Sequence, residues 1–341
     1  MKKRIAVFLF SLVLLFSLFA CEMKSDFEES GEESSEVSQE ISGGEQNARV
    51  MFFRGEEFDI ELAKKKFKTA ARIDSLKDYT SEYSKYNSYI HFQSLNENEK
   101  LVYKAIEYAL YNCHRHIVFD VSLLKDSKYT VINILEILAA DTPLLEQNLW
   151  RTYRDVEFTV DSEDGEQETY KGTLLSCDNF AFTVFGKKED AIKLAEDIVK
   201  GMPEGLSELA TARYLYKQLG EGTNYDIGEE GIQNYLYDAL AGTSTHCDGF
   251  ANAYSLLCNM VGLQCYEKIW HPVSGDGHTW NTVRINNSWY NVDVSMIADT
   301  KDQDSSVYFW YGFGFKDASY RATHKYQDIA PVCYGWISVK D

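Results

Sequence analysis

Three short segments in the second half of the chain contain side chains that together could perform nucleophilic catalysis. Cys247 lies in the segment THCDGFA, His278 in GHTWN, and Asp293 at the end of WYNVD. A cysteine thiol is a good nucleophile only as the thiolate, so it needs a nearby base, and the base needs a partner that fixes its tautomer. These three residues are therefore the possible components of a Cys-His-Asp triad.

Cys247 is predicted to begin a helix. Apolar and aromatic residues follow it at a helical period as far as Val261, and Gly262 suits the C-terminal cap. The first turn of a helix carries unpaired N–H groups with partial positive charge, which favour a thiolate and can stabilise an oxyanion. The N–H of Cys247 is therefore the expected oxyanion donor, whereas the sequence assigns no second donor.

His278 and Asp293 are predicted to lie on a β-hairpin. Residues 278–285 and 288–294 have strand-like patterns. Between them stand Asn286 and Asn287, and asparagine tolerates the positive φ that a two-residue turn requires. The sequence therefore predicts two antiparallel strands joined by a tight turn.

The register of this hairpin decides whether the imidazole and the carboxylate can meet. If Ile285 pairs with Ser288, the alternation of side chains places His278 and Asp293 on one face as diagonal neighbours. Such neighbours are about 7–8 Å apart at Cα, within reach of two side chains that lean together. A shift of the turn would separate them, so this prediction depends on the register.

The three segments resemble the transglutaminase-like superfamily, whose members share a papain-related Cys-His-Asp site. An upstream helix expected at residues 207–219, followed by the sequence NYD at 224–226, extends the resemblance, which covers about residues 205–300. The resemblance implies an α+β fold with a transglutaminase-like, papain-like core. In this core the nucleophile helix packs on an antiparallel sheet, and a mixed helical and β region precedes it.

The resemblance also implies a role for each member of the triad. Cys247 would be the nucleophile, His278 the base and later the acid, and Asp293 the residue that orients the imidazole. Taken singly, each has a structural alternative: a buried thiol, a strand histidine facing solvent, and a turn or sheet-edge carboxylate. His246 and His271 are rival bases, but His246 is adjacent to the thiol and His271 precedes a proline, so we favour His278.

Three further residues are candidates for a substrate groove. Trp280 and Trp289 fall on the predicted triad face and could line a dry groove, and Asn281 belongs to the same motif as His278. The alternative for either tryptophan is packing in the core.

Neither a metal nor a cofactor is expected. Cys113, His114 and His116 are possible ligands, but three ligands so close in sequence rarely converge on one ion, and no matching pair lies nearby. A helix end is the preferred interpretation of this segment. The calcium dependence of eukaryotic cross-linking members is not carried over, because no matching acidic loop is visible.

The amino end predicts export and lipid anchoring. Three basic residues precede an apolar run from Ile5 to Ala20, which suits a signal peptide and is short for a membrane span. The run ends in LFAC, which resembles a bacterial lipobox, so residues 1–21 are interpreted as a lipoprotein signal peptide with Cys21 as the lipidated residue. The expected location is the outer face of the bacterial cytoplasmic membrane. An uncleaved anchor or an ordinary secretory signal would also export the protein.

The rest of the chain divides into three predicted regions. Residues 22–48 are rich in Glu, Ser and Gly and are expected to form a disordered acidic tether, because they offer little apolar surface to bury. Residues 49–200 are expected to form a mixed α/β region and residues 201–341 the transglutaminase-like catalytic domain. Within the mixed region the expected elements are a helix opened by a Ser94/Glu97 capping box, helices at 131–140 and 190–200, and a hairpin of strands 156–160 and 168–175.

Charge and cysteine content limit the partners. The chain has 53 acidic and 34 basic residues and a net charge of −19, which argues against nucleic acid. The expected partners are a protein or peptide substrate, with cell-wall peptide as one candidate, and the membrane through the lipid on Cys21. Among the other cysteines, Cys258 and Cys265 are expected as buried thiols, and the spacing predicts no disulfide framework.

These observations predict an extracytoplasmic, lipid-anchored cysteine enzyme that acts on amide bonds through a thioester acyl-enzyme. Water would release the acyl group in a protease or amidase, and an amine would release it in a transglutaminase. Hydrolysis is slightly favoured, because water is the default acceptor unless a site excludes it. The alternative is a noncatalytic surface module that kept the fold to bind peptide or cell-wall glycopeptide.

Overall fold

The computed structural model describes seven stretches of the chain: 48–54, 58–145, 150–161, 166–177, 187–225, 235–270 and 278–295. The predicted signal peptide with Cys21, the tether except Ala48, and His271 lie outside the described residues. In the stretches described, no helix is both long and apolar enough to cross a membrane.

The described residues form two compact units. The first takes the described residues up to Tyr79 together with 104–127 and 148–186, and the second takes 80–103, 128–147 and 187 onward. The division expected at residue 200 does not coincide with these units. Segments 80–103, 128–147 and 187–200 belong with the elements that carry Cys247, because their contacts are with that part of the chain.

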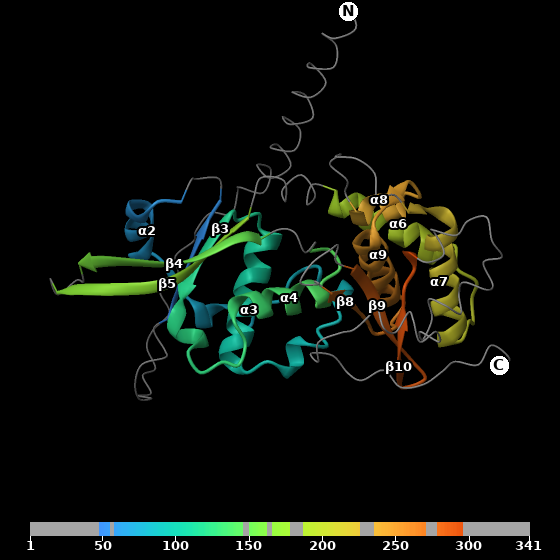
Figure 1. The fold of residues 1–341 in the computed structure, drawn as a ribbon, viewed down its shortest axis with the longest axis horizontal. Helices are drawn as coiled ribbons and strands as arrows, with labels where there is room; N and C mark the ends of the chain where they lie inside the picture. Colours follow the sequence, from blue (N-terminus) through green and yellow to red (C-terminus); the bar gives the residue numbers. More distant parts are fainter. Residues whose placement is uncertain are drawn as a thin grey trace, which may run out of the picture. The chain divides into compact units, whose positions relative to one another are not determined.

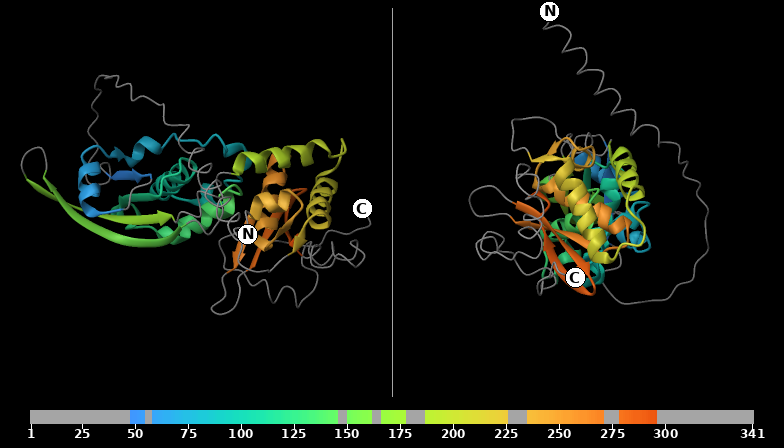
Figure 2. Two further views of the ribbon diagram at one scale, coloured as in Figure 1. Left: turned by 90° about the horizontal axis from the view of Figure 1, so that it is seen from above. Right: turned by 90° about the vertical axis from the view of Figure 1, so that its right-hand side faces the viewer.

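The first unit is built on a five-stranded antiparallel sheet in the order β2-β1-β3-β5-β4 (Figure 1). Its strands are β1 (Arg49–Phe53), β2 (Ala71–Arg72), β3 (His116–Asp120), β4 (Trp150–Asp161) and β5 (Gln167–Cys177). The predicted hairpin is confirmed and is longer at both ends, and it forms the long green ribbon in Figure 2.

Helix α2 (Ile60–Phe67) completes the core of the first unit. Ala63 and Phe67 on α2 pack in one buried cluster with Phe53, Phe158 and Tyr170 of the sheet. Burial of such aromatic side chains stabilises the unit by about 1.5–3 kcal/mol each. The 3₁₀ helices among the described residues are η1 (Ile73–Leu76), η2 (Ser84–Tyr86), η3 (Phe92–Ser94) and η4 (Val121–Leu124).

Helix α3 (Glu97–Tyr111) is present as predicted, but its capping residues differ from the expected pair. Asn96 Oδ1 accepts from the N–H of Glu99 at 2.9 Å, and Glu99 Oε2 accepts from the N–H of Asn96 at 2.8 Å. The Ser94 hydroxyl instead donates to the His91 carbonyl at 2.7 Å. The prediction of a Ser94/Glu97 box was wrong because Asn96 offers a second box two residues further on.

The described residues of the second unit include several helices and a three-stranded antiparallel sheet in the order β10-β9-β8, and the first part of α3 also belongs to this unit (Figure 1). The helices are α4 (Val131–Asp141), α6 (Lys188–Lys200), α7 (Glu208–Gly222), α8 (Tyr235–Leu240) and α9 (Cys247–Met260). The strands of this sheet are β8 (Cys265–Trp270), β9 (His278–Ile285) and β10 (Ser288–Val292). A separate parallel pair consists of β6 (Asn224–Tyr225) and β7 (Ser244–Thr245).

Helix α9 lies at the centre of the second unit and packs on β8 and β9 (Figure 2). The hydroxyl of Tyr254 on α9 donates to the Ala212 carbonyl of α7 at 3.1 Å, and Asn281 Nδ2 of β9 donates to the Ala251 carbonyl of α9 at 2.8 Å. This arrangement confirms the predicted α+β core, in which the helix that begins at Cys247 packs on an antiparallel sheet.

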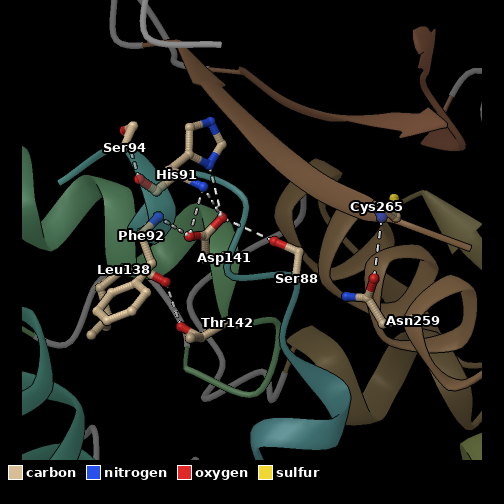
Figure 3. Close-up of polar contacts among 9 residues, drawn as sticks. All are labelled: Ser88, His91, Phe92, Ser94, Leu138, Asp141, Thr142, Asn259 and Cys265. Carbon is tan, nitrogen blue, oxygen red and sulfur yellow. Dashed lines mark hydrogen bonds and ion pairs between the residues drawn. The ribbon is translucent and has the colours of Figure 1, made fainter. Parts of the chain in front are cut away.

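Segment 80–103 joins this unit through buried polar contacts around Asp141 (Figure 3). The Asp141 carboxylate accepts from the Ser88 hydroxyl and from the N–H of Phe92, both at 2.9 Å, and from the N–H of His91. Its Oδ1 also lies 2.8 Å from His91 Nδ1. The His91 ring meets the ring of Tyr266 on β8 edge-on, with centroids 4.5 Å apart. Asp141 therefore joins the end of α4 to the segment around His91, and the His91 ring contacts the sheet.

Candidate active site

Cys247 is the first residue of α9, as predicted. His246 is the N-cap and has extended backbone angles, but its side chain makes no capping hydrogen bond. Cys247 is half-buried, and its thiol lies 3.8 Å from Asp248 Oδ1. The predicted C-terminal cap is also present, because Gly262 has a φ of +81°. The sulfur is therefore positioned at the positive end of a helix.

The hairpin that carries the other two residues has the predicted register. Ser288 pairs with Ile285, and Asn291 pairs with Thr282. Both turn residues between the strands have positive φ, 49° and 66°. These angles suit the tight turn, whose twist matches that of the flanking strands. The local chemistry of the turn thus sets the register on which the site depends.

His278 and Asp293 make direct contact. His278 Nε2 lies 2.7 Å from Asp293 Oδ2. Asp293 Oδ1 accepts from the Ser295 hydroxyl at 2.5 Å and from the Ser295 N–H at 3.1 Å. The Asp293 side chain is 1% exposed and that of His278 is 25% exposed. Both oxygens of the Asp293 carboxylate are therefore in polar contacts, whereas the His278 imidazole remains accessible.

The imidazole of His278 also lies beside the thiol. Burial by itself lowers the pKa of His278, but the hydrogen bonds and charges of Asp293 and Cys247 outweigh burial and raise this pKa to about 10. Because Asp293 occupies Nε2, the nitrogen left for the sulfur is Nδ1. The structure thus brings the three predicted triad residues together, with His278 between the thiol and the carboxylate.

Two residues near Asp293 were not given a role by the sequence. Ser295 follows the end of β10 and supplies both donors to Asp293 Oδ1. Tyr216, on α7, is fully buried, and burial together with the negative charge of Asp293 raises its pKa well above the usual value. The spacing of Ser295 two residues after Asp293 is typical of a local side-chain turn and could have indicated this contact. Nothing in the sequence pattern indicates Tyr216.

The three groove candidates have different outcomes. Trp280 is 1% exposed, so its assignment to a groove was wrong and it packs in the core, where its ring stacks on that of His278 with centroids 5.9 Å apart. Asn281 is 0% exposed and donates to the Ala251 carbonyl. Its assignment to a groove was wrong, because strand alternation turns it toward α9 and away from the His278 face. Trp289 is half-buried, meets Tyr266 edge-on, and is the candidate that stays accessible.

The residues considered for a metal have separate partners. Cys113 follows the end of α3 with a φ of 55°, which agrees with the expected helix end. His114 stacks against Tyr108, and His116 Nδ1 lies 2.8 Å from the Ser176 hydroxyl. Among the described residues, no group of three or more His, Cys, Asp or Glu side chains could hold a metal ion.

Comparisons with known proteins agree with this core. Residues 192–294 match the family model described as the transglutaminase-like superfamily. Kyphoscoliosis peptidase from Mus musculus is 25% identical over 131 residues, which are 34% of this chain and 19% of that protein, and the Homo sapiens protein gives the same figures. The chain thus spans about a fifth of the length of these curated relatives.

Two solved structures are also similar. One, described as a TGase, has 15% identity and a TM-score of 0.30, with 47% of this chain and 49% of that chain covered. The periplasmic domain of TgpA from Pseudomonas aeruginosa has 11% identity and a TM-score of 0.25, with 53% and 69% covered. The part of the chain that is similar to the transglutaminase-like superfamily, residues 192–294, contains Cys247, His278 and Asp293.

Proposed function

We propose that this chain is a cysteine enzyme that acts on amide bonds of protein or peptide substrates through a thioester acyl-enzyme. The observation that carries the proposal is the contact of His278 with both the Asp293 carboxylate and the Cys247 thiol, with the imidazole pKa raised to about 10. At neutral pH an imidazole with this pKa holds a proton, so it can stabilise a thiolate beside it. A thiolate is the form of cysteine that attacks a carbonyl carbon.

The reaction would proceed in two halves. Cys247 Sγ forms a bond to the carbonyl carbon, and the carbonyl oxygen gains the electron pair and accepts from the N–H of Cys247 at the start of α9. His278 then gives its proton to the leaving amine, and the C–N bond breaks to leave a thioester. In the second half His278 takes a proton from the acceptor, which attacks the thioester and releases Cys247.

The acceptor decides the class of enzyme. Water gives a protease or amidase, and an amine gives a transglutaminase. We favour water, because it is the default acceptor at a site that does not exclude it. Cell-wall peptide is one candidate substrate.

Export and a lipid anchor at Cys21 are part of the same proposal and rest on the sequence alone. The basic residues, the apolar run and the LFAC motif at 18–21 support a lipoprotein on the outer face of the bacterial cytoplasmic membrane. Metabolic labelling with a radioactive fatty acid tests the anchor. Wild-type protein should carry the label and a Cys21→Ala variant should not, whereas equal labelling would exclude lipidation at Cys21.

The enzymatic proposal is tested with p-nitrophenyl acetate, a general acyl donor. The purified full chain should release one equivalent of nitrophenolate in a burst and gain an acetyl group on Cys247, located by mass spectrometry after acid quenching. Adding glycine methyl ester separates the acceptors, since a transglutaminase-type site would transfer acetyl to the amine and a hydrolase would form acetate. A full chain that is folded but shows neither a burst nor an adduct would favour the binding module.

A further inference from the structure

The Asp293 carboxylate receives two hydrogen bonds from a single residue, Ser295. The Ser295 hydroxyl donates to Asp293 Oδ1 at 2.5 Å, and the Ser295 backbone N–H donates to the same oxygen at 3.1 Å. Both residues are buried, so the hydroxyl meets a carboxylate that is withdrawn from water. Contacts of about 2.5–2.7 Å are typical of a hydroxyl that donates to a charged oxygen. Oδ1 is therefore occupied, and Oδ2 faces His278 Nε2 at 2.7 Å.

Two donors on one oxygen restrict the rotation of the carboxylate. The terminal torsion of an aspartate side chain is broad, so a carboxylate with a single partner can turn about its Cβ–Cγ bond. The backbone N–H of Ser295 and its hydroxyl together hold Oδ1 and thereby set the direction of Oδ2. The His278 side chain is 25% exposed, so packing alone constrains the imidazole less than it constrains a buried ring. The alignment of the imidazole therefore depends on the direction of Oδ2.

A second turn in the chain has the same spacing and a different setting. The N–H of Ser122 donates to Asp120 Oδ1 at 2.9 Å, where Asp120 caps the 3₁₀ helix η4. Ser122 is exposed, whereas Ser295 is 5% exposed and its hydroxyl contacts a carboxylate that also meets an imidazole. A serine two residues after an aspartate is thus a common local turn. Burial and the imidazole are what distinguish the turn at Asp293.

We propose that Ser295 is a positioning residue for the candidate triad, and that its hydroxyl holds Asp293 Oδ1 so that Oδ2 stays aligned with His278 Nε2. The role rests on the function proposed for Cys247. Ser295 acts through the carboxylate and takes no part in the transfer of the acyl group. Its contribution is to keep the imidazole in one orientation, which is what a base must have to exchange protons with a thiol and a leaving amine.

Three variants of the full chain isolate the hydroxyl. Ser295→Ala removes it, and Ser295→Thr and Ser295→Val have nearly the same shape and differ in the hydroxyl. All three retain the backbone N–H, so a difference between the threonine and valine variants comes from the hydroxyl. This comparison also covers the case in which Ser295→Ala folds poorly. Ser122→Ala, at the exposed turn of the same spacing, is the matched control.

The direct readout is the exchange with water of the His278 Nε2 proton, followed by NMR of the full chain labelled with ¹⁵N-histidine. The signal is identified by its loss in His278→Gln. Ser295→Ala and Ser295→Val should exchange this proton about tenfold faster than wild type, because the acceptor is no longer fixed. Ser295→Thr and Ser122→Ala should stay within about twofold. The Nδ1 proton of His91 beside Asp141 is the internal reference and should exchange equally in all samples.

The second readout is the rate at which p-nitrophenyl acetate acetylates Cys247, expressed per folded molecule. Ser295→Ala and Ser295→Val should lower this rate about tenfold, the effect expected from losing one hydrogen bond to a charged group. Ser295→Thr should remain within about threefold of wild type. Urea denaturation of the same preparations gives the folded fraction. A purely structural role of Ser295 would change stability and leave the rate per folded molecule unchanged.

Two results would overturn the inference. Equal proton exchange in Ser295→Thr and Ser295→Val would show that the hydroxyl does not hold the pair. The absence of a slowly exchanging His278 proton in wild type would show that Asp293 does not hold that proton. A wild-type chain that forms no acetyl adduct on Cys247 would count against the proposed function instead, and proton exchange would still decide the role of Ser295.

Discussion

The second unit contains two histidine–aspartate pairs whose contacts are almost equal in length. His91 Nδ1 lies 2.8 Å from Asp141, and His278 Nε2 lies 2.7 Å from Asp293. Their surroundings differ. The His91 side chain is 3% exposed and packs edge-on against Tyr266, whereas that of His278 is 25% exposed and lies beside a thiol. A short contact between imidazole and carboxylate therefore does not by itself mark a catalytic site.

The partners of the two carboxylates explain the difference. Asp141 accepts from backbone N–H groups of His91 and Phe92 in a segment about 50 residues away, so it organises a chain connection. Asp293 accepts from Ser295, two residues away, and leaves the His278 ring open on its other side. One pair is surrounded by groups that need a fixed acceptor, and the other is placed where a proton can move.

The two pairs should differ most in how the loss of the imidazole changes the acetylation rate of Cys247. His278→Ala should lower the rate of acetylation of Cys247 by p-nitrophenyl acetate about 10³-fold, because the thiolate loses its counterion and base. His91→Ala should leave the rate per folded molecule within about twofold. Stopped-flow release of nitrophenolate measures both variants against the folded fraction from tryptophan fluorescence. A similar loss in both would remove the functional distinction.

Removing the buried carboxylate of Asp141 should lower the stability of the fold and not the reactivity of Cys247. Asp141→Ala should lower the free energy of unfolding by about 3–5 kcal/mol, because several buried donors and His91 lose their acceptor. Urea denaturation of the full chain under reducing conditions measures this loss. Ser88→Ala removes a single donor to the same carboxylate and should cost only about 1 kcal/mol. Equal losses in the two variants would mean that Asp141 is not the centre of the cluster.

The same exchange of carboxylate for amide at the two sites sharpens the comparison. Asp293→Asn should lower the acetylation rate of Cys247 about 10²-fold, because the charge that keeps His278 protonated is lost. Asp141→Asn should reduce stability and leave the rate per folded molecule almost unchanged. Initial rates and urea midpoints on the same preparations test this pair. A rate loss for Asp141→Asn would show that the structural pair also supports catalysis.

The raised pKa of His278 predicts a pH dependence of stability with a definite sign. The folded-state pKa of about 10 is above the usual 6.5, so folding favours the protonated imidazole. This contribution is fully present below about pH 6.5 and is lost as the pH rises toward 10. The free energy of unfolding should therefore fall between these pH values more steeply for wild type than for His278→Gln. Parallel slopes would show that the pKa is not raised.

The smallest expected effect concerns the carboxylate next to the thiol. Asp248 Oδ1 lies 3.8 Å from the Cys247 sulfur, and a negative charge there opposes formation of the thiolate. Asp248→Asn should increase the rate of iodoacetamide alkylation of Cys247 at pH 6 about two- to fivefold. Asp238→Asn, on α8 where the carboxylate accepts from the Thr243 hydroxyl, is the matched control and should not change the rate. A slower alkylation of Cys247 in Asp248→Asn would show that the Asp248 carboxylate assists the thiol and does not oppose it.

Much of the candidate site was predictable because its geometry is local. The apolar period after Cys247 and the glycine at 262 define the helix, and the two asparagines at 286 and 287 define the turn. Once the turn is set, side-chain alternation places His278 and Asp293 together without information from the rest of the chain. The same alternation, applied to Asn281, would have corrected its assignment to the groove.

Long-range packing accounts for what was missed. The sequence contains no signal that Asp141 would accept from residues near 90, or that the charge of Asp293 would act on Tyr216. The capping box was missed for a local reason, since Asn96 and Glu99 form the box two residues after the expected Ser94 and Glu97.

Local sequence was sufficient to predict the contact of His278 with Asp293, the helix that begins at Cys247 and the hairpin register, because caps, turns and alternation act over a few residues. Tertiary contacts were needed to establish which histidine–aspartate pair is open and which is buried, and which segments join the second unit. Burial and access depend on contacts between residues far apart in the chain, which no local pattern contains.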